Sequence, residues 1–170
     1  RMGLPVPPGF TISTKVCEIF YKDKKKLNSK LIKQIKTELK VIEKDVKKKF
    51  GDLKNPLLLS VRSGARVSMP GMMDTILNLG LNDKTVIALA NKTQNGRFAK
   101  ESYRRFIQMY GNVVMGVESY HFEELIENYK LTKGVLLDTD LNEQDWDGLI
   151  KDFKKTVKEK TNKDFPQNVD

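Results

Sequence analysis

Apolar side chains recur every three or four residues through most of residues 82–166, and this spacing is typical of amphipathic helices. A first helix is expected over "NDKTVIALANKT", with Asn82 or Asp83 as its N-cap. Three more are expected in "NGRFAKESYRRFIQMYGNVVMG", "ESYHFEELIENYKL" and "LNEQDWDGLIKDFKKTVKEKT". The last of these should turn five residues toward a core: Trp146, Leu149, Ile150, Phe153 and Val157. Residues 82–170 are therefore predicted to form a helical subdomain.

Residues 1–81 have a mixed pattern. The run "LLLSV" at 57–61 follows Pro56 and is almost continuously apolar, which favours a strand that is buried on both faces. A short β-prone run lies in "PVPPGFTIST", and a helix is expected through "KVCEIFYK" with Ser13 or Thr14 as its N-cap. We therefore predict an α+β fold, in which a partial α/β subdomain at residues 1–81 precedes the helical subdomain at 82–170.

The net charge of +9 is concentrated in the first fifty residues. Residues 1–50 hold 14 Lys/Arg and 5 Asp/Glu, whereas the remaining 120 residues hold 17 of each. Most of the excess lies in residues 22–50, where one apolar stripe predicts a single long helix with lysines on its other faces. A nucleic-acid-binding patch usually brings arginines and interleaved aromatic side chains, and this segment has neither. The lysines are therefore interpreted as a solvated helix face.

Several kinds of site have too few residues to be built. Cys17 and His121 are the single cysteine and the single histidine, so an internal disulfide, a cysteine zinc site and a Cys-His pair are not expected. His121 is interpreted as a structural or surface residue. No apolar stretch approaches the ~20 residues that span a bilayer, and no signal peptide is visible. A cytoplasmic location is expected.

The segment "SVRSGARVSMPGMMD" at 60–74 has the composition of a phosphate site. Arg62 is expected at the end of the predicted strand, and a guanidinium fork matches phosphate oxygens. Small residues follow it, and Ser68 with the Pro70-Gly71 pair supplies a hydroxyl and a turn with free N–H groups. The alternative is an arginine that pairs with Asp74 or another carboxylate to brace a turn. The lysine of a Walker motif is missing, which excludes a P-loop.

These residues resemble the N-terminal nucleotide-binding domain of the pyruvate, phosphate dikinase family. The resemblance rests mainly on "PLLLSVRSGARVSMPGMMDTILNLGLND" at 56–83, and it covers nearly all of the chain. The other matching segments are "PVPPGFTIST" (5–14), "KKFGD" (48–52), "RFAKESYRRFIQMYGNVVMGV" (97–117) and "LDTDL" (137–141).

The resemblance implies an ATP-grasp architecture with a largely helical insert, to which residues 82–166 would correspond. It implies that Arg62 binds ATP phosphates and that Gly71 belongs to the loop that closes over the nucleotide. Arg66 and Ser68 belong to the same motif and complete the expected ATP-binding set. No catalytic residue and no metal ligand is expected within these 170 residues.

The resemblance also implies an activity, the conversion of ATP, phosphate and pyruvate to AMP, pyrophosphate and phosphoenolpyruvate. The Mg²⁺-binding carboxylates, the phosphocarrier histidine and the pyruvate-binding barrel are expected beyond Asp170, so this segment alone is expected to be inactive. The expected partners are ATP and the rest of the same enzyme, as a homo-oligomer, without nucleic acid or membrane. Two alternatives stay open: a phosphoenolpyruvate synthase-like nucleotide domain, which would use water in place of phosphate, and a basic helical nucleic-acid-binding module.

Overall fold

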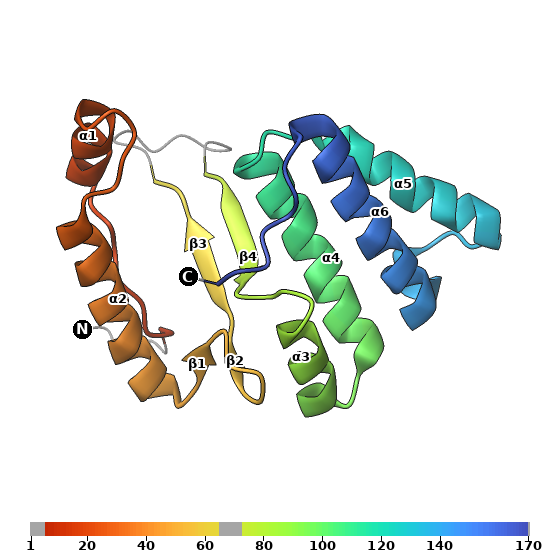
Figure 1. Ribbon diagram of the computed structural model, residues 1–170. Coiled ribbons are helices and arrows are strands. Elements are labelled where there is room, and N and C mark those ends of the chain that lie inside the picture. The colour runs from red at the N-terminus through yellow and green to blue at the C-terminus, as the bar shows by residue number, and fades with distance from the viewer. Residues whose placement is uncertain (1–5, 65–72, 170) are drawn as a thin grey trace. The chain divides into compact units, whose positions relative to one another are not determined.

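The computed structural model describes residues 6–64 and 73–169 (Figure 1). By its contacts the chain divides into two compact units, one of residues 1–49 and 64–73 and the other of residues 50–63 and 74–170. The first unit contains two helices, α1 (Lys15–Lys22) and α2 (Ser29–Val46). The second contains most of the strands and the remaining helices.

The lysine-rich segment 22–50 is not the single long helix that was predicted. Helix α1 ends at Lys22, and Lys24 and Lys25 adopt positive φ values of 53° and 60°, which interrupt the helix. Helix α2 begins after Asn28, whose Oδ1 accepts a hydrogen bond of 2.8 Å from the Leu31 N–H. The lysines of α2 are exposed, which agrees with a solvated helix face, and their interpretation as that rather than as a nucleic-acid-binding patch stays a prediction.

The apolar stripe of α2 is only partly covered. Ile42 is buried, whereas Leu31, Ile35 and Leu39 are half-buried. The helix that was expected through "KVCEIFYK" is confirmed as α1, and Thr14 precedes its first residue.

The described residues form two short ladders. Strand β1 (Lys49–Phe50) pairs with β2 (Pro56–Leu57), and β3 (Leu59–Arg62) pairs antiparallel with β4 (Thr75–Leu79). The prediction of one strand at 57–61 buried on both faces is wrong. Leu57 is buried, but Ser60 and Val61 are exposed, because among the described strands β3 has only β4 as a neighbour.

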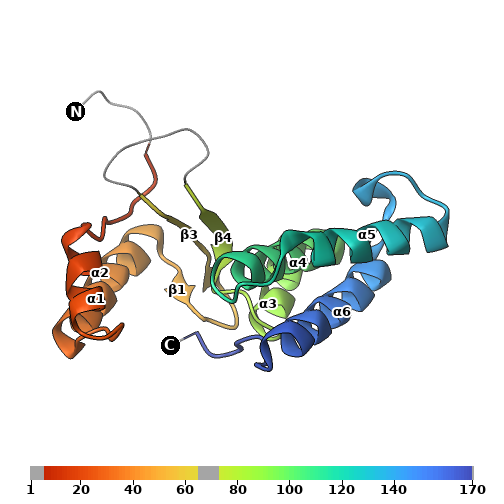
Figure 2. The same cartoon turned by 90° about the horizontal axis from the view of Figure 1, so that it is seen from above.

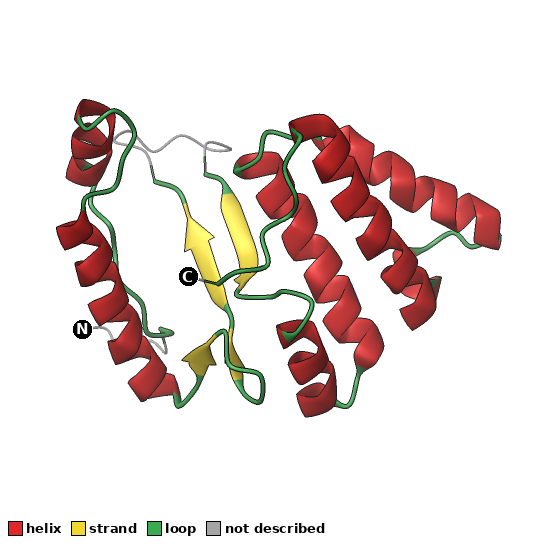
Figure 3. Ribbon diagram, viewed as in Figure 1, coloured by secondary structure: helices red, strands yellow, loops and turns green. Residues whose placement is uncertain are grey.

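Four α-helices and a short 3₁₀ helix complete this unit (Figure 3). Helices α4 and α6 pack together, α3 and β4 pack on α4, and α5 packs on α6. Figure 2 shows α3, α4, α5 and α6 together on one side of β3 and β4. Their bounds are Thr85–Thr93 for α3, Gly96–Val113 for α4, Ser119–Lys133 for α5, Asp138–Asp140 for the 3₁₀ helix and Glu143–Thr161 for α6.

The predicted helical core is confirmed. Buried side chains of α6 pack in one core with Phe122 of α5 and Ile107 of α4. Phe122 and Ile107 have none of their surface exposed. Removing this apolar surface from water stabilises the helices by about 25 cal/mol for each Å² buried. The five α6 residues that were expected to face the core are all buried: Trp146, Leu149, Ile150, Phe153 and Val157.

The start of α3 and the chain after α6 are held together. Lys84 directly precedes α3 and makes no side-chain cap bond, whereas the predicted cap Asn82 holds the turn before the helix: its Oδ1 accepts the Thr85 N–H at 2.8 Å while Thr85 Oγ1 accepts the Asn82 N–H at 2.8 Å. Asn82 also donates from Nδ2 to the Gln167 carbonyl oxygen at 3.0 Å. Phe165 packs edge-on against Phe106, with their ring centroids 5.6 Å apart.

The predicted boundary between residues 81 and 82 differs from the division by contacts. Strand β4 packs on α4, and Ile76 belongs to the same core as the helices. The assignment of residues 1–81 to one subdomain and 82–170 to another stays a prediction. Among the described residues, no helix combines the length and the apolar character that crossing a membrane requires.

Acid should weaken the start of α6 through Asp145. Lys133 Nζ lies 2.9 Å from Asp145 Oδ1, and this contact lowers the pKa of the Asp145 carboxyl group. The Asn142 N–H, which donates to Asp145 Oδ2 at 3.0 Å, lowers that pKa further. A lowered folded-state pKa stabilises the fold above the unfolded value of about 3.9, and this stability is lost as the pH falls through the folded value.

We therefore expect the free energy of unfolding of Asp145→Asn to depend less on pH below about 4 than that of wild type. Urea titrations at pH 7, 5, 4 and 3 would measure this. Glu159→Gln removes the same charge from an exposed position on α6 and serves as the control. If the free energy of unfolding fell equally steeply with pH in Asp145→Asn and in wild type, the lowered pKa of Asp145 would be contradicted.

Candidate functional site

The end of β3 and the start of β4 are joined at residues 62, 63, 74 and 75, which are called the neck and which flank segment 64–73 in the sequence. Arg62 is the last residue of β3 and lies opposite Thr75 in the ladder. Beyond this pair, the Ser63 N–H donates to the Asp74 carbonyl oxygen at 2.9 Å, and the Asp74 N–H donates to Ser63 Oγ at 2.8 Å. Segment 64–73 therefore leaves and re-enters the ladder at one fixed point.

The Arg62 side chain is exposed at this neck. Its position at the end of the strand is confirmed, but the expected burial of the strand that leads to it is not, because β3 lies open to solvent beyond Leu59. Within the described part of the chain, Arg62 forms no ion pair with Asp74 or with another carboxylate. The turn is braced by the Ser63 hydroxyl instead, which leaves the guanidinium available for an anion.

The other three predicted ATP-binding residues, Arg66, Ser68 and Gly71, lie outside the described residues. The structure describes Gly64 and Met73, which flank that segment. Both are exposed, and a Cβ atom built on Gly64 would meet no heavy atom within 4 Å.

Strand β4 fixes the ladder to the helices at two points that the sequence did not single out. The Leu77 N–H lies 3.5 Å from the Met109 Sδ, and Asn78 Nδ2 donates to the Ser102 carbonyl oxygen at 3.3 Å. Asn78 has a φ of 60° in the middle of the strand. An asparagine directly before "LG" was the available signal, because asparagine tolerates this left-handed conformation better than most residues.

A second polar cluster joins α3, α4 and α6, away from the motif. Tyr103 Oη donates to Asp83 Oδ1 at 3.0 Å, and Lys154 contacts both the same carboxylate and the face of the Tyr103 ring. Burial of the Tyr103 hydroxyl raises its pKa far above the usual value for tyrosine. The phenol therefore stays protonated, and the cluster holds the three helices together.

His121 lies half-buried on α5, where its ring centroid is 3.9 Å from that of Tyr120. This agrees with the interpretation of His121 as a structural or surface residue. Over residues 6–64 and 73–169, the structure contains no group of three or more His, Cys, Asp or Glu side chains that could hold a metal ion.

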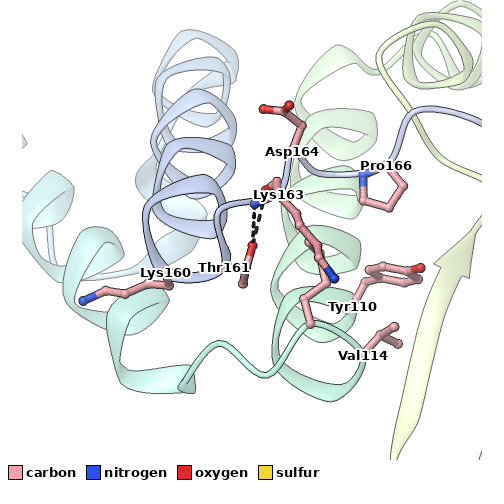
Figure 4. Close-up of a pocket in the computed structure, with 8 residues that line it drawn as sticks. Tyr110, Val114, Lys160, Thr161, Lys163, Asp164 and Pro166 are labelled. Carbon is pink, nitrogen blue, oxygen red and sulfur yellow. Dashed lines mark hydrogen bonds between the residues drawn. The ribbon is translucent and has the colours of Figure 1, made fainter.

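A cavity of about 480 Å³ opens where α4 and α6 end (Figure 4). Tyr110 lines it from α4, Val114 from directly after α4, Thr161 from the end of α6 and Lys163 from the chain beyond (Figure 4). The C-terminal ends of two helices meet there, and the partial negative charge of a helix C-terminus disfavours an anion. Lysines lie in the last turn of α6, whereas the last turn of α4 has no basic side chain. The cavity contains no residue of the predicted phosphate motif.

When the chain is compared with known proteins, a protein family matches more than half of its length. Residues 1–95 match the family described as "Pyruvate phosphate dikinase, AMP/ATP-binding domain". Proteins named pyruvate, phosphate dikinase are 52% identical in Clostridium symbiosum over 167 residues and 49% identical in Entamoeba histolytica over 166, in each case 98% of this chain and 19% of the relative. A relative named as chloroplastic, from Mesembryanthemum crystallinum, is 51% identical over 97% of this chain and 17% of its own length. The chain therefore spans about a fifth of the length of these relatives.

Proposed function

Because the chain belongs to the pyruvate phosphate dikinase AMP/ATP-binding domain family, we propose that it supplies part of the ATP site of a pyruvate, phosphate dikinase. In that enzyme ATP, phosphate and pyruvate are converted to phosphoenolpyruvate, AMP and pyrophosphate. The names of the relatives, each of them about half identical to the chain over nearly its whole length, support this activity rather than that of a synthase.

The proposal rests on the exposure of the Arg62 side chain and on its lack of a carboxylate partner among the described residues. Its guanidinium is exposed at the neck of segment 64–73 and has no carboxylate partner within the described part of the chain. The Ser63–Asp74 pair fixes the backbone immediately beside it. An arginine whose backbone is fixed in a paired strand and whose guanidinium has no carboxylate partner among the described residues can bind two phosphate oxygens of ATP at once.

Arg62 acts by neutralising charge on the transferring phosphates. In phosphoryl transfer the protein contributes mainly positioning and electrostatic stabilisation of the phosphate oxygens. Segment 64–73, with Arg66, Ser68 and Gly71, closes over the nucleotide and excludes water from it. The Mg²⁺ that accompanies ATP is held by carboxylates outside the residues described.

The remaining parts of the proposal concern the whole enzyme. This chain forms part of an ATP-grasp domain, and phosphohistidine and pyruvate-binding domains of the same enzyme take the phosphoryl group onward. The enzyme is a homo-oligomer. Its location is the cytoplasm, or an organelle as for the relatives named chloroplastic, and cell fractionation would distinguish the two.

A hybrid enzyme tests the proposed function. Residues 1–170 replace the matching segment of the Clostridium symbiosum relative, to which they are 52% identical. We expect this hybrid dikinase to form phosphoenolpyruvate, AMP and pyrophosphate from pyruvate, ATP and phosphate, with all three substrates required. Product analysis by chromatography, with and without phosphate, measures this.

Two outcomes would contradict the proposal. Formation of phosphoenolpyruvate without added phosphate, with phosphate rather than pyrophosphate as a product, would indicate a synthase. A folded hybrid that forms no AMP from ATP would show that this segment does not supply a dikinase ATP site.

A further inference from the structure

Strand β4 contains a bulge that sets the register of Arg62. Leu59 pairs with Leu79 and Val61 pairs with Ile76, so that one residue of β3 faces two residues of β4 between these pairs. Ser60 on β3 therefore faces both Leu77 and Asn78, so that β4 carries one extra residue. A bulge of this kind changes which side chains face a given side of the strand.

The bulge is centred on Asn78, which has a φ of 60°. Most side chains are disfavoured in this left-handed conformation, and asparagine and glycine adopt it most readily. The Asn78 side chain also makes a hydrogen bond, in which Nδ2 donates to the Ser102 carbonyl oxygen of α4 at 3.3 Å. The conformation is therefore fixed by residue type and by a bond to the helix.

Because of the bulge, β4 residues before it and after it along the chain both point into the helical core. Ile76 is buried in that core, and Leu79, three residues later, also packs against it. In a strand without a bulge, residues three apart point to opposite faces. Loss of the bulge would remove one of these two side chains from the core, so the core favours the bulged register.

The same register fixes the direction of Arg62. Past the bulge, Arg62 pairs with Thr75, and Ser63 and Asp74 close the neck. Because side chains alternate along a strand, a slip of one residue would turn Arg62 to the other face of the ladder. We propose that Asn78 is a positioning residue, whose left-handed backbone aims Arg62 at the phosphates of ATP.

This inference rests on the proposed function, and variants in the hybrid dikinase test it. Asn78→Val, in which a β-branched residue must adopt the left-handed conformation, should slow single-turnover AMP formation at saturating ATP about 10-fold to 100-fold. Asn78→Gly, which keeps the conformation and loses only the bond to Ser102, should retain most of the rate.

The matched control is Asn162→Val. Asn162 has a φ of 56° at the exposed C-terminus of α6, outside the β3–β4 ladder, so valine meets the same backbone conflict there without altering the register of that ladder. Both valine variants should lower the midpoint of thermal unfolding, but only Asn78→Val should slow AMP formation. If Asn78→Val fails to fold, Asn78→Ala makes the same comparison against Asn162→Ala.

A double-mutant cycle with Arg62→Leu separates this inference from the proposed function. If Asn78 acts through Arg62, Asn78→Val should have no further effect on AMP formation in the Arg62→Leu background. The positioning role of Asn78 would be overturned if Asn78→Val slowed AMP formation equally in the wild-type and Arg62→Leu backgrounds, or if Asn162→Val slowed it as much as Asn78→Val. Neither result would contradict the proposed ATP site. An Arg62→Leu variant with the wild-type rate would instead overturn the proposed function.

A measurement on the 170-residue chain needs no activity. Cross-strand nuclear Overhauser contacts between Arg62 and Thr75 should be present in wild type and in Asn78→Gly. They should be weakened or replaced by contacts of another register in Asn78→Val. Unchanged contacts in Asn78→Val would contradict the inference.

Discussion

Arg62→Leu should slow the ATP half-reaction of the hybrid dikinase by a factor on the order of 10²–10³, the cost of removing a group that stabilises transition-state charge. The side chain is exposed and forms no ion pair among the described residues, so its removal leaves no buried partner unsatisfied. The fold should be kept, because the ladder is held by backbone bonds and by the Ser63–Asp74 pair.

Rapid-quench measurement of AMP formation in a single turnover gives this rate without interference from later steps. Arg105→Leu is the matched control, because Arg105 is an exposed arginine of α4 that pairs with Glu101 of the same helix. It removes the same charge and should leave the rate near that of wild type. A wild-type rate in folded Arg62→Leu would refute the role of Arg62 at the phosphates.

Phe153→Ala should lower the free energy of unfolding of the chain by about 3–5 kcal/mol. Phe153 is fully buried on α6, and its ring centroid lies 4.8 Å from that of Phe122 on α5. Truncation removes the buried apolar surface and leaves a cavity between two helices that the surrounding side chains refill only in part.

Urea denaturation of the chain, followed by circular dichroism, measures the change. Phe98→Ala serves as the control, because Phe98 lies on α4 with 47% of its surface exposed. Its effect should stay within roughly 0.5 kcal/mol. Comparable destabilisation by the two variants would contradict the assignment of the core to the faces of α4, α5 and α6 that enclose Phe153.

The sequence predicted the helices well because their spacing reports burial directly. Residues three and four apart on a helix share one face, so Trp146, Ile150 and Phe153 could be assigned to the core before any fold was known. The turn that Asn82 holds before α3 was readable for a similar reason, since its bonds are local.

The strands were harder to predict, because their burial depends on which other strands lie beside them. The run at 57–61 is apolar in the sequence, yet Val61 is 46% exposed, since β3 pairs only with β4 among the described strands. The break in the lysine-rich helix was missed because the apolar spacing continues through Leu27, although Asn28 already marks a helix start.

The candidate site was predicted in part. The sequence placed Arg62 at a strand end but gave no sign of the Ser63–Asp74 neck, whose two halves are eleven residues apart. It also gave no sign of the register, because a bulge depends on which residues of two strands face each other. A single asparagine such as Asn78 is compatible with many turns, and only the pairing of β3 with β4 shows its role.

The most direct test of the account is a crystal structure of the hybrid dikinase with Mg²⁺ and a non-hydrolysable ATP analogue. The account predicts that Arg62 donates hydrogen bonds to phosphate oxygens at about 2.7–2.9 Å, with Arg62 opposite Thr75 and the bulge at Asn78 intact. A triphosphate bound in the enzyme with the Arg62 guanidinium turned away from it, or paired with a protein carboxylate, would contradict the central claim.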